Sequence, residues 1–249
     1  MRAAVCALFT LTSLTSSLAQ AASASAPGVI AQYPPPDTTV SPVLNIGSPF
    51  GGFDFQQDVL NEFATAFEIP PGQSWRITGL QIMDSLVCST GGSYSMRLYT
   101  SAADARVPGN QVFAQQDSTC WDDLGTITID SAQYRRIQIN VCGASSEFVL
   151  DNPGPDPIRV WPSFWGLHCL TQATWGVCQP QVDVSTPAAY RCGVPDNCIA
   201  GQTVNVWTDY ASLGQSLPNC VPYTTLLGTT VPIDEIFADG FELIAPSQI

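Results

Sequence analysis

The stretch Phe67-Glu68-Ile69-Pro70-Pro71-Gly72-Gln73-Ser74-Trp75-Arg76-Ile77 decides the fold. It has a strand-forming segment on each side of a central Pro-Gly pair. Pro71 presets one dihedral angle of a turn, and Gly72 supplies a positive one that other residues rarely adopt. Trp75 begins the second segment with a large side chain suited to burial. The stretch therefore predicts a strand, a tight turn and a second strand.

The second strand, expected over Ser74–Asp84, changes its apolar face along its length. Its apolar residues are Trp75 and Ile77 near the start but Leu80 and Ile82 near the end, so they move from odd to even positions. A regular strand with one buried face keeps the same parity throughout. The change of parity therefore predicts a bend or a β-bulge.

Short runs of β-branched and aromatic residues, separated by Gly, Pro, Asn and Asp, continue this pattern along the chain. Ile127 and Ile129 alternate with polar residues, as do Ile137 and Ile139, which is typical of half-buried antiparallel strands. The number of such runs predicts an all-β protein, an antiparallel β-sandwich or jelly roll, with a closed barrel as the alternative. The further strands are expected over Phe63–Ile69, Tyr94–Ser101, Gln111–Gln116, Gly125–Asp130, Arg135–Val141, Ile158–Trp165 and Thr203–Tyr210.

The amino terminus has the parts of an export signal. Met1 and Arg2 give a positive start, residues 3–18 form an apolar stretch, and Ala19-Gln20-Ala21 places small residues where a signal peptidase cleaves. The apolar stretch is interrupted by Thr and Ser, and it is shorter than the roughly 20 apolar residues of a membrane-spanning helix. We therefore predict a cleaved signal peptide over residues 1–21 and a secreted or periplasmic mature chain without a membrane span.

Composition divides the rest of the chain into three parts. Residues 22–43 are rich in Ala, Ser, Pro and Thr and lack periodicity, which predicts a flexible linker. Residues 44–232 contain the predicted strands and form the β-sandwich domain. Residues 233–249 are predicted to be a C-terminal tail.

The cysteines predict a disulfide-stapled domain. The chain has nine, of which Cys6 belongs to the predicted signal peptide. The remaining eight predict four disulfides in an oxidising compartment, although sequence alone leaves on the order of a hundred connectivities open. The absence of a CxxC pair and the presence of a single histidine argue against a zinc site. Our pairing hypothesis is Cys169–Cys178 and Cys192–Cys198 as short local bridges, then Cys88–Cys120, and by elimination Cys142–Cys220.

The charge excludes one class of partner. The chain has 21 Asp and Glu against eight Arg and no Lys, which gives a formal net charge of -13. Such a surface repels phosphate groups, whereas nucleic-acid binding needs clustered basic residues. We therefore expect no nucleic-acid partner, and an extracellular glycan or protein is the partner class that remains.

Catalytic motifs are absent from the sequence. It has no GxSxG, HExxH, GxGxxG or phosphate-binding loop. A serine triad would have to use His168, the only histidine, which we interpret as structural. No catalytic residue and no cofactor is therefore predicted.

Tryptophans provide the remaining functional signal. Trp161, Trp165 and Trp175 could stack on sugars, but Trp161 and Trp165 share one strand face, which favours a place in the core. The leading prediction is an exported non-enzymatic module for structure, adhesion or interaction. The alternative is a carbohydrate-binding module that uses exposed tryptophans. An extracellular polysaccharide-acting enzyme is third, because a pair of carboxylates is enough for glycoside hydrolysis.

Two stretches resemble known families. Residues 67–77 look like the F-x-V-P-x-G-Q-x-W-x-I entry of many secreted bacterial β-sandwich domains. Ile236–Glu242 is similar to the IFxDGFE tail of a group of exported Gram-negative bacterial proteins of largely uncharacterised function. The second resemblance implies an exported protein whose tail acts as a sorting or attachment signal. From the residues themselves we favour another role, in which Ile236, Phe237 and Phe241 pack on the sandwich around the Asp-Gly turn.

The tail also carries four carboxylates that could hold calcium through oxygen ligands, at Asp234, Glu235, Asp239 and Glu242. Their spacing matches neither an EF-hand nor a nonapeptide repeat. Calcium is therefore a minor hypothesis, which a calorimetric titration without heat would remove.

Overall fold

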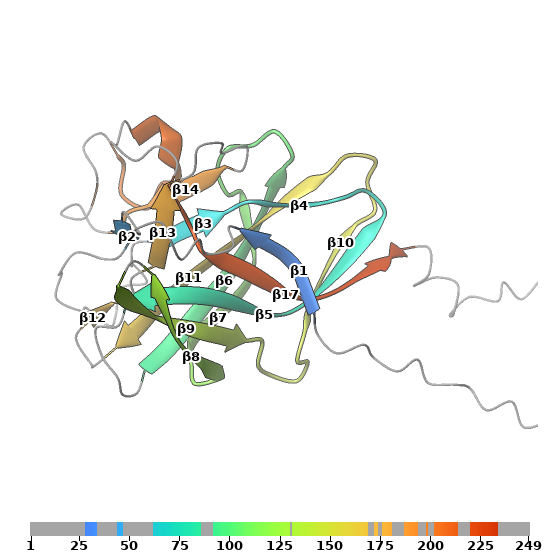
Figure 1. Ribbon diagram of the computed structural model, residues 1–249. Coiled ribbons are helices and arrows are strands. Elements are labelled where there is room, and N and C mark those ends of the chain that lie inside the picture. The colour runs from blue at the N-terminus through green and yellow to red at the C-terminus, as the bar shows by residue number, and fades with distance from the viewer. Residues whose placement is uncertain are drawn as a thin grey trace, which may run out of the picture.

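In the computed structural model, the strands of the protein form two layers. The described residues are 28–33, 44–46, 62–85, 92–129, 131–168, 172–173, 176–180, 187–193, 198, 202–213 and 220–233. Nearly all of their elements are strands, which form two antiparallel sheets packed face to face (Figure 1). The predicted all-β antiparallel sandwich is confirmed. Among these residues, no helix has the length and apolar character needed to cross a membrane.

The first sheet is built around one long strand, β5 (Gln73–Ser85). Five strands follow one another in the order β1 (Gly28–Tyr33), β17 (Thr224–Pro232), β5, β13 (Gly176–Pro180) and β16 (Cys220–Pro222). The remaining strands pair with β5, β13 or each other: β10 (Phe148–Asn152) and β9 (Ala132–Asn140) with β5, β8 (Trp121–Ile129) with β9, and β2 (Leu44–Ile46) with β13.

The second sheet is built around β11 (Ile158–His168). The strand order is β15 (Thr208–Asp209), β14 (Ala188–Arg191), β3 (Glu62–Thr65), β11, β6 (Gly92–Ala102) and β7 (Asn110–Ser118). Two short strands also pair with β11, namely β4 (Phe67–Ile69) and β12 (Gln172–Ala173). A 3-10 helix, η2 (Tyr210–Leu213), follows β15.

The predicted turn at Pro71 and Gly72 connects the two sheets. Gly72 has a φ of 70°, as expected for the residue that supplies the positive dihedral angle. β4, before the turn, belongs to the second sheet, whereas β5, after it, belongs to the first. The turn is therefore a corner of the sandwich, and Trp75, only 4% exposed, anchors the strand that leaves it.

The corner is fastened by a buried side chain, Asn152. Its amide Nδ2 donates to the carbonyl oxygens of Ile69 at 3.0 Å and Asp156 at 2.9 Å, and its backbone oxygen accepts from the Gly72 N–H at 2.8 Å. Asn152 is 2% exposed. A single residue of β10 thus connects the end of β4, the start of β5 and the turn before β11.

The predicted bulge in β5 is confirmed. Gly79 pairs with Leu227 but Ile77 pairs with Gly228, so Thr78 is the extra residue. Beyond this point β5 also changes partner, because β9 pairs with Gly79–Ser85 and β10 with the first part of the strand. The bulge lets one strand bury opposite faces in its two halves.

Two other predictions about elements were wrong. Gly28–Tyr33 lies in the segment predicted as a flexible linker, yet it forms β1 and pairs with β17. Thr203–Tyr210 was predicted as a strand, but only Thr208–Asp209 is one. In this segment Asn205 has a positive φ of 64° and its N–H donates to the carbonyl of Cys192, so the backbone turns despite the alternation of its side chains.

The structure forms two disulfides among the described cysteines. Cys192–Cys198 is confirmed, with a Cα–Cα distance of 5.0 Å. Cys120 is bonded to Cys142, so the predicted pairs Cys88–Cys120 and Cys142–Cys220 are wrong. The reason is the pairing of β8 with β9, which places Cys120 beside the end of β9. The side chains of Cys88, Cys169, Cys178 and Cys220 lie outside the described part, and Cys169–Cys178 stays a prediction.

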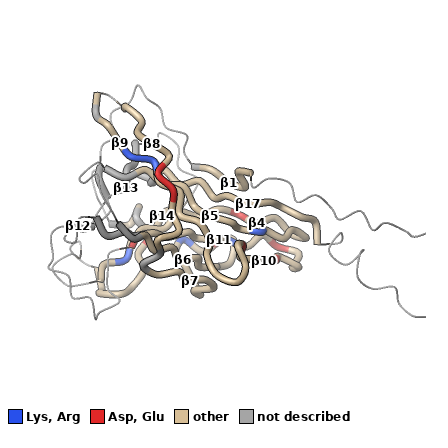
Figure 2. The backbone as a smooth tube through the Cα atoms, turned by 90° about the horizontal axis from the view of Figure 1, so that it is seen from below, with Lys and Arg blue, Asp and Glu red and all other residues tan. Residues whose placement is uncertain are grey.

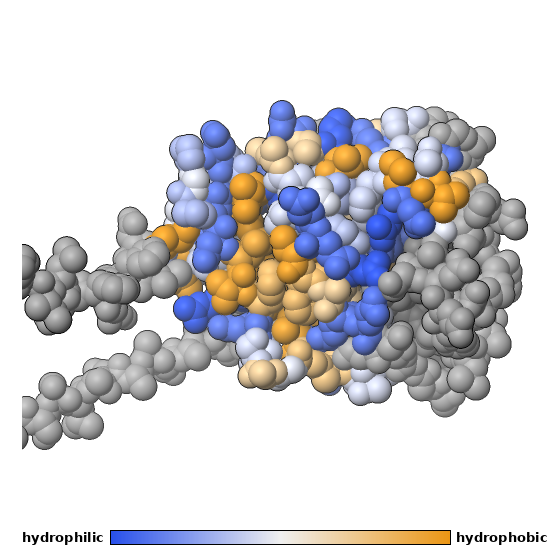
Figure 3. Space-filling model, turned by 180° about the vertical axis from the view of Figure 1, so that it is seen from behind, coloured by the Kyte–Doolittle hydropathy of each residue, from blue (hydrophilic) through white to orange (hydrophobic). Residues whose placement is uncertain are grey.

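The surface has few charged positions along the described backbone, and basic and acidic ones lie side by side at β8 and β9 (Figure 2). Hydrophobic residues also gather on one face among hydrophilic neighbours (Figure 3). The large apolar side chains that are exposed in the described part are all valines, namely Val29, Val112, Val149 and Val206. Exposed valines are ordinary for a protein surface.

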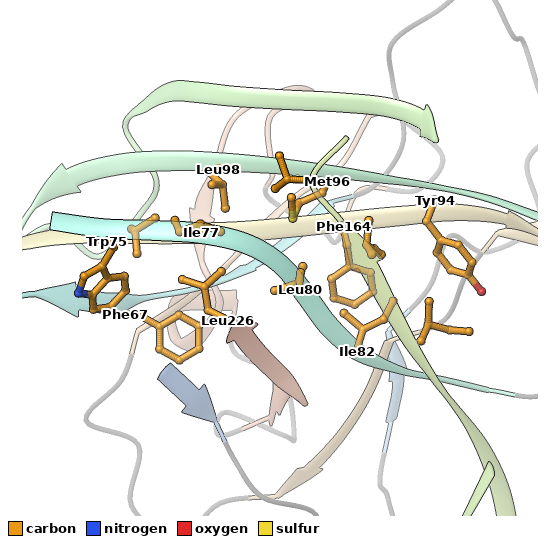
Figure 4. Close-up of a cluster of buried hydrophobic side chains, with 14 of the residues drawn as sticks. Phe67, Trp75, Ile77, Leu80, Ile82, Tyr94, Met96, Leu98, Phe164 and Leu226 are labelled. Atoms are coloured by element: carbon orange, nitrogen blue, oxygen red, sulfur yellow. The ribbon is translucent and has the colours of Figure 1, made fainter. Parts of the chain in front are cut away.

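The main core lies between the sheets. Residues of β5, β6 and β9 point into it together with Leu226 of β17, and Figure 4 shows labelled side chains of β5, β6 and β17 meeting between the layers. Burial of each large apolar side chain contributes about 1.5–3 kcal/mol. The members below 2% exposure are Ile69, Ile77, Leu80, Tyr94, Met96, Leu98, Ile137, Ile139, Val160 and Leu226.

Candidate functional site

A cluster of polar side chains is buried on the face of the second sheet that points away from the main core. It consists of Glu62, Arg97, Tyr99, Ser163 and Arg191, and is called the Glu62 cluster here. The strand register assembles it, because Arg191 lies opposite Glu62 in the β14–β3 pair and Ser163 lies opposite Arg97 in the β11–β6 pair. Four neighbouring strands therefore each contribute to one cluster.

Glu62 is the centre of the cluster. Its Oε1 accepts from Arg97 Nη1 at 2.5 Å and from Arg191 Nη2 at 2.8 Å. Its Oε2 accepts from the Tyr99 hydroxyl at 2.8 Å and from Ser163 Oγ at 3.3 Å. The side chains of Glu62 and Arg97 are only 2% and 8% exposed. Both carboxylate oxygens thus accept hydrogen bonds, and those to Oε1 come from two guanidinium groups.

Tyr99 is held as a neutral hydrogen-bond donor. Burial, followed by the charge of Glu62, raises the pKa of Tyr99 to about 12, against the opposing effect of Arg191. The phenol therefore keeps its proton over the physiological range, and this proton is directed to Glu62. Tyr99 acts as a donor to the carboxylate and has no accessible ionised form for use as a base.

The cluster reaches toward the surface at Trp207. The Arg191 guanidinium lies 5.1 Å from the centre of the Trp207 ring, and the Tyr99 ring meets Trp207 edge-on at 5.3 Å. Trp207 is half-buried and packs against a small apolar cluster that includes Ala64, Tyr99 and Trp161. The outer face of the second sheet thus has a core of its own, with arginine and aromatic side chains in contact.

The predicted sugar-binding role of Trp161 is wrong, and its interpretation as a core residue is confirmed. Trp161 is 0% exposed, and its Nε1 donates to Ser101 Oγ at 2.8 Å. A ring without exposed surface cannot stack on a sugar. Trp175 and the side chains of Trp165 and His168 lie outside the described residues, and their roles stay predictions.

The carboxylates proposed for calcium, Asp234, Glu235, Asp239 and Glu242, also lie outside the described residues. Within the part of the chain that the structure does describe, no group of three or more His, Cys, Asp or Glu side chains could hold a metal ion. The calcium hypothesis is therefore still untested.

Sequence reasoning missed the Glu62 cluster. Arg97 and Tyr99 alternate with Met96 and Leu98, so they read as the solvated face of a half-buried strand. The cluster is buried because the sheet extends to β14 and β15, and β14, which carries Arg191, was not predicted. One signal in the sequence could have indicated the cluster. The chain has only eight basic residues, and Arg97 and Arg191 are two of them.

Both oxygens of the Glu62 carboxylate are saturated with hydrogen bonds. Among the described residues, the hydrogen-bond and ion-pair partners of Glu62 are two arginines, a tyrosine and a serine, and none is a second carboxylate. The geometry is that of a polar network which ties strands together. No protein-family model, curated protein or solved structure matches the chain.

Proposed function

We propose that the chain is an exported, non-enzymatic β-sandwich module with a role in structure, adhesion or interaction. The observation that carries this proposal is the saturation of Glu62. It is the buried acidic side chain of the described residues, and both its oxygens are engaged by Arg97, Arg191, Tyr99 and Ser163. A general acid or base must instead be free to exchange a proton with a substrate.

Two features support the exported part of the proposal. The first 21 residues have the composition of a cleavable signal. Cys120–Cys142 and Cys192–Cys198 are bonded in the folded domain. Structural disulfides of this kind persist in oxidising compartments such as the periplasm or the extracellular medium.

The alternative of a polysaccharide-acting enzyme is less well supported. A glycosidase of the common type places two carboxyl groups across the bond that it cleaves, about 5–10 Å apart. Glu62 is turned toward basic and hydroxyl groups in a site closed by its own partners. A polysaccharide-acting enzyme would instead need two carboxyl groups that face the substrate.

The test compares stability with turnover in Glu62→Gln. We expect no turnover of polysaccharide, peptide or ester substrates by the wild-type chain. We also expect the variant to lose about 3 kcal/mol in the free energy of unfolding, because it breaks a buried ion pair. Glu68→Gln is the matched control, since Glu68 pairs with Arg159 on the same sheet but is 55% exposed.

The control should change the free energy of unfolding by less than about 1 kcal/mol. The proposal is overturned if the wild-type chain turns over one of these substrates. Loss of that turnover in a stable Glu62→Gln variant would assign the activity to Glu62.

A further inference from the structure

A row of hydrogen-bonded side chains crosses the outer face of the first sheet. Gln81 Nε2 donates to Gln138 Oε1 at 2.9 Å, and Gln138 Nε2 donates to Asn140 Oδ1 at 2.8 Å. Asn140 Nδ2 in turn donates to Asp122 Oδ2 at 2.8 Å. We call these four residues the amide ladder. They belong to β5, β9 and β8, so the ladder runs across three neighbouring strands (Figure 1).

The strand register holds the ladder on the side of the sheet that faces away from the core. Gln138 lies opposite Gln81 in the β5–β9 pair and opposite Asp122 in the β8–β9 pair. Ile139, between Gln138 and Asn140, is 0% exposed in the main core. Because successive side chains of a strand point to opposite faces, the amides point outward. Asp122 is exposed there, and the other three members are half-buried.

The ladder keeps hydrogen-bonding capacity for a ligand. A side-chain amide has two N–H donors and an oxygen that can accept two hydrogen bonds. Within the described part of the chain, the side chains of Gln138 and Asn140 each use one donor and one acceptor position, and Gln81 uses one donor. The Asp122 carboxylate accepts through Oδ2 and keeps Oδ1. Unused N–H groups and unused lone pairs therefore lie next to each other along the ladder.

The side chains of the ladder are already ordered. Its three hydrogen bonds run in one direction and end at the carboxylate of Asp122, so each bond polarises the next. Each amide is also held in one orientation by its neighbour. Side chains that are fixed beforehand lose less entropy when a ligand binds. The ladder therefore presents its unused donors and acceptors at a small entropic cost.

The charge around the ladder favours a neutral ligand. Asp122 provides a carboxylate at one end. Arg136 provides a guanidinium on the same face of β9, two residues before Gln138, and donates to the carbonyl oxygen of Leu124. The two charges balance each other locally. The whole chain has a formal charge of -13, which repels anionic polymers.

We propose that the amide ladder binds an extended neutral polysaccharide that lies across β8, β9 and β5. A hydroxyl group both donates and accepts at a single atom, so it matches positions where an unused N–H lies beside an unused lone pair. Asp122 accepts from a hydroxyl at the end of the ladder. An extended peptide would instead pair with the edge of a sheet through its backbone, whereas the ladder lies on a face. This inference rests on the proposed non-enzymatic role and names its ligand class.

The experiment is affinity electrophoresis of the purified chain in native gels. The gels contain mixed-linkage β-glucan or galactomannan, two neutral polysaccharides with extended chains. Polygalacturonate is the anionic comparison, and gelatin is the polypeptide comparison. Retardation is expected in at least one neutral polysaccharide and in neither comparison. Added salt should leave this retardation unchanged, because the ligand carries no charge.

Two variants locate the binding in the ladder. Gln138→Ala interrupts its middle and should weaken the apparent affinity about fivefold, as expected for a lost neutral hydrogen bond. Asp122→Asn should weaken it about tenfold, because hydrogen bonds to a charged acceptor are stronger. Gln111→Ala is the matched control, since Gln111 is an exposed glutamine of β7 on the second sheet. It should leave retardation unchanged, and urea denaturation checks that every variant is folded.

Three results would overturn the inference: no retardation in either neutral polysaccharide, equal retardation in polygalacturonate or gelatin, or equal losses in folded Gln138→Ala and Gln111→Ala. Failure of the inference can be told from failure of the proposed function, because the same gels stained for reducing ends report cleavage of the polymer. Cleavage would overturn the non-enzymatic role, whereas absence of both binding and cleavage overturns the ligand class alone.

Discussion

Gly228 shows how closely one residue can be specified by backbone geometry. It lies at the β5 bulge with a φ of 148°, and a Cβ placed on it would lie 1.9 Å from the carbonyl oxygen of Arg76. We expect Gly228→Ala to lower the free energy of unfolding by about 3 kcal/mol, from overpacking and backbone strain together. Urea denaturation measures the change.

A substitution at Gly125 distinguishes overpacking from backbone strain. It also has a positive φ, 82°, but an added Cβ would have no neighbour within 4 Å. Gly125→Ala should therefore cost only the strain, about 1 kcal/mol. Equal costs at the two positions would show that the close contact with Arg76 does not matter.

Asn152 carries the second prediction at this scale. Asn152→Ala removes the amide that serves the carbonyl oxygens of Ile69 and Asp156, and a buried carbonyl left without a donor costs about 1–3 kcal/mol. We expect a loss of about 2 kcal/mol in the free energy of unfolding, measured by urea denaturation. Asn140→Ala is a useful comparison, because Asn140 is more exposed and its amide donates to a surface acid, Asp122. A larger loss in Asn140→Ala would contradict the role given to Asn152.

The β8–β9 hairpin is the element whose stability should depend most clearly on pH. A hydrogen bond from Arg135, followed by one from the Gly125 N–H, lowers the pKa of Asp123. A carboxyl group with a depressed folded pKa stabilises the protein above its unfolded pKa, about 3.9, and this contribution is lost as the pH falls through the folded pKa. Asp123→Asn should therefore lower the Tm at pH 7 but not at pH 2.

The control for this prediction is Asp151→Asn, on the exposed side of β10. It should leave the Tm similar to that of the wild type at both pH values. If Asp123→Asn lowered the Tm equally at pH 7 and pH 2, the effect would come from packing and the electrostatic explanation would fail.

Elements with a strong local pattern were predictable from sequence, and those specified by distant contacts were not. The turn at Gly72, the bulge in β5 and the alternating strands follow from dihedral preference and side-chain parity. β1 has no such pattern, since Gly28–Tyr33 becomes a strand only because β17 supplies its hydrogen bonds. Similarly, Cys120–Cys142 depends on the register between β8 and β9, which spacing in the sequence does not reveal.

The candidate site is the clearest case of this difference. The side chains of the Glu62 cluster come from β3, β6, β11 and β14, and no two of these strands are consecutive in the chain. The alternation of polar and apolar residues along β6 places Arg97 on the outer face of the sheet. It cannot indicate that other apolar residues cover that face. Recognition of the cluster therefore required the sheet order.

At the scale of the whole molecule, three of the described edge strands are irregular. β1, β7 and β8 each pair on one side within the described residues, and each ladder contains a register shift. Bulges on edge strands disturb the regular row of backbone groups that another chain would need for pairing. These three edges therefore oppose edge-to-edge aggregation.

A truncation tests the dependence of the whole sandwich on its last strand. β17 lies between β1 and β5 in the first sheet. A chain without residues 224–249 should therefore lose the single cooperative unfolding transition, followed by circular dichroism on heating. A chain ending at Ile233 keeps β17 and should retain that transition. Cooperative unfolding of the shorter chain would show that the sheet does not need β17.

The pairing of β1 with β17 also determines when the sandwich can be completed. Figure 1 shows the two strands side by side, although they come from opposite ends of the described chain. When a chain is delivered with its amino end first, β1 is delivered early but has no partner until β17 has also been delivered. Bringing these two distant strands together closes the longest loop of the sheet, and we expect this to be the slow step of folding. The domain can therefore complete its fold only after the whole chain has been delivered.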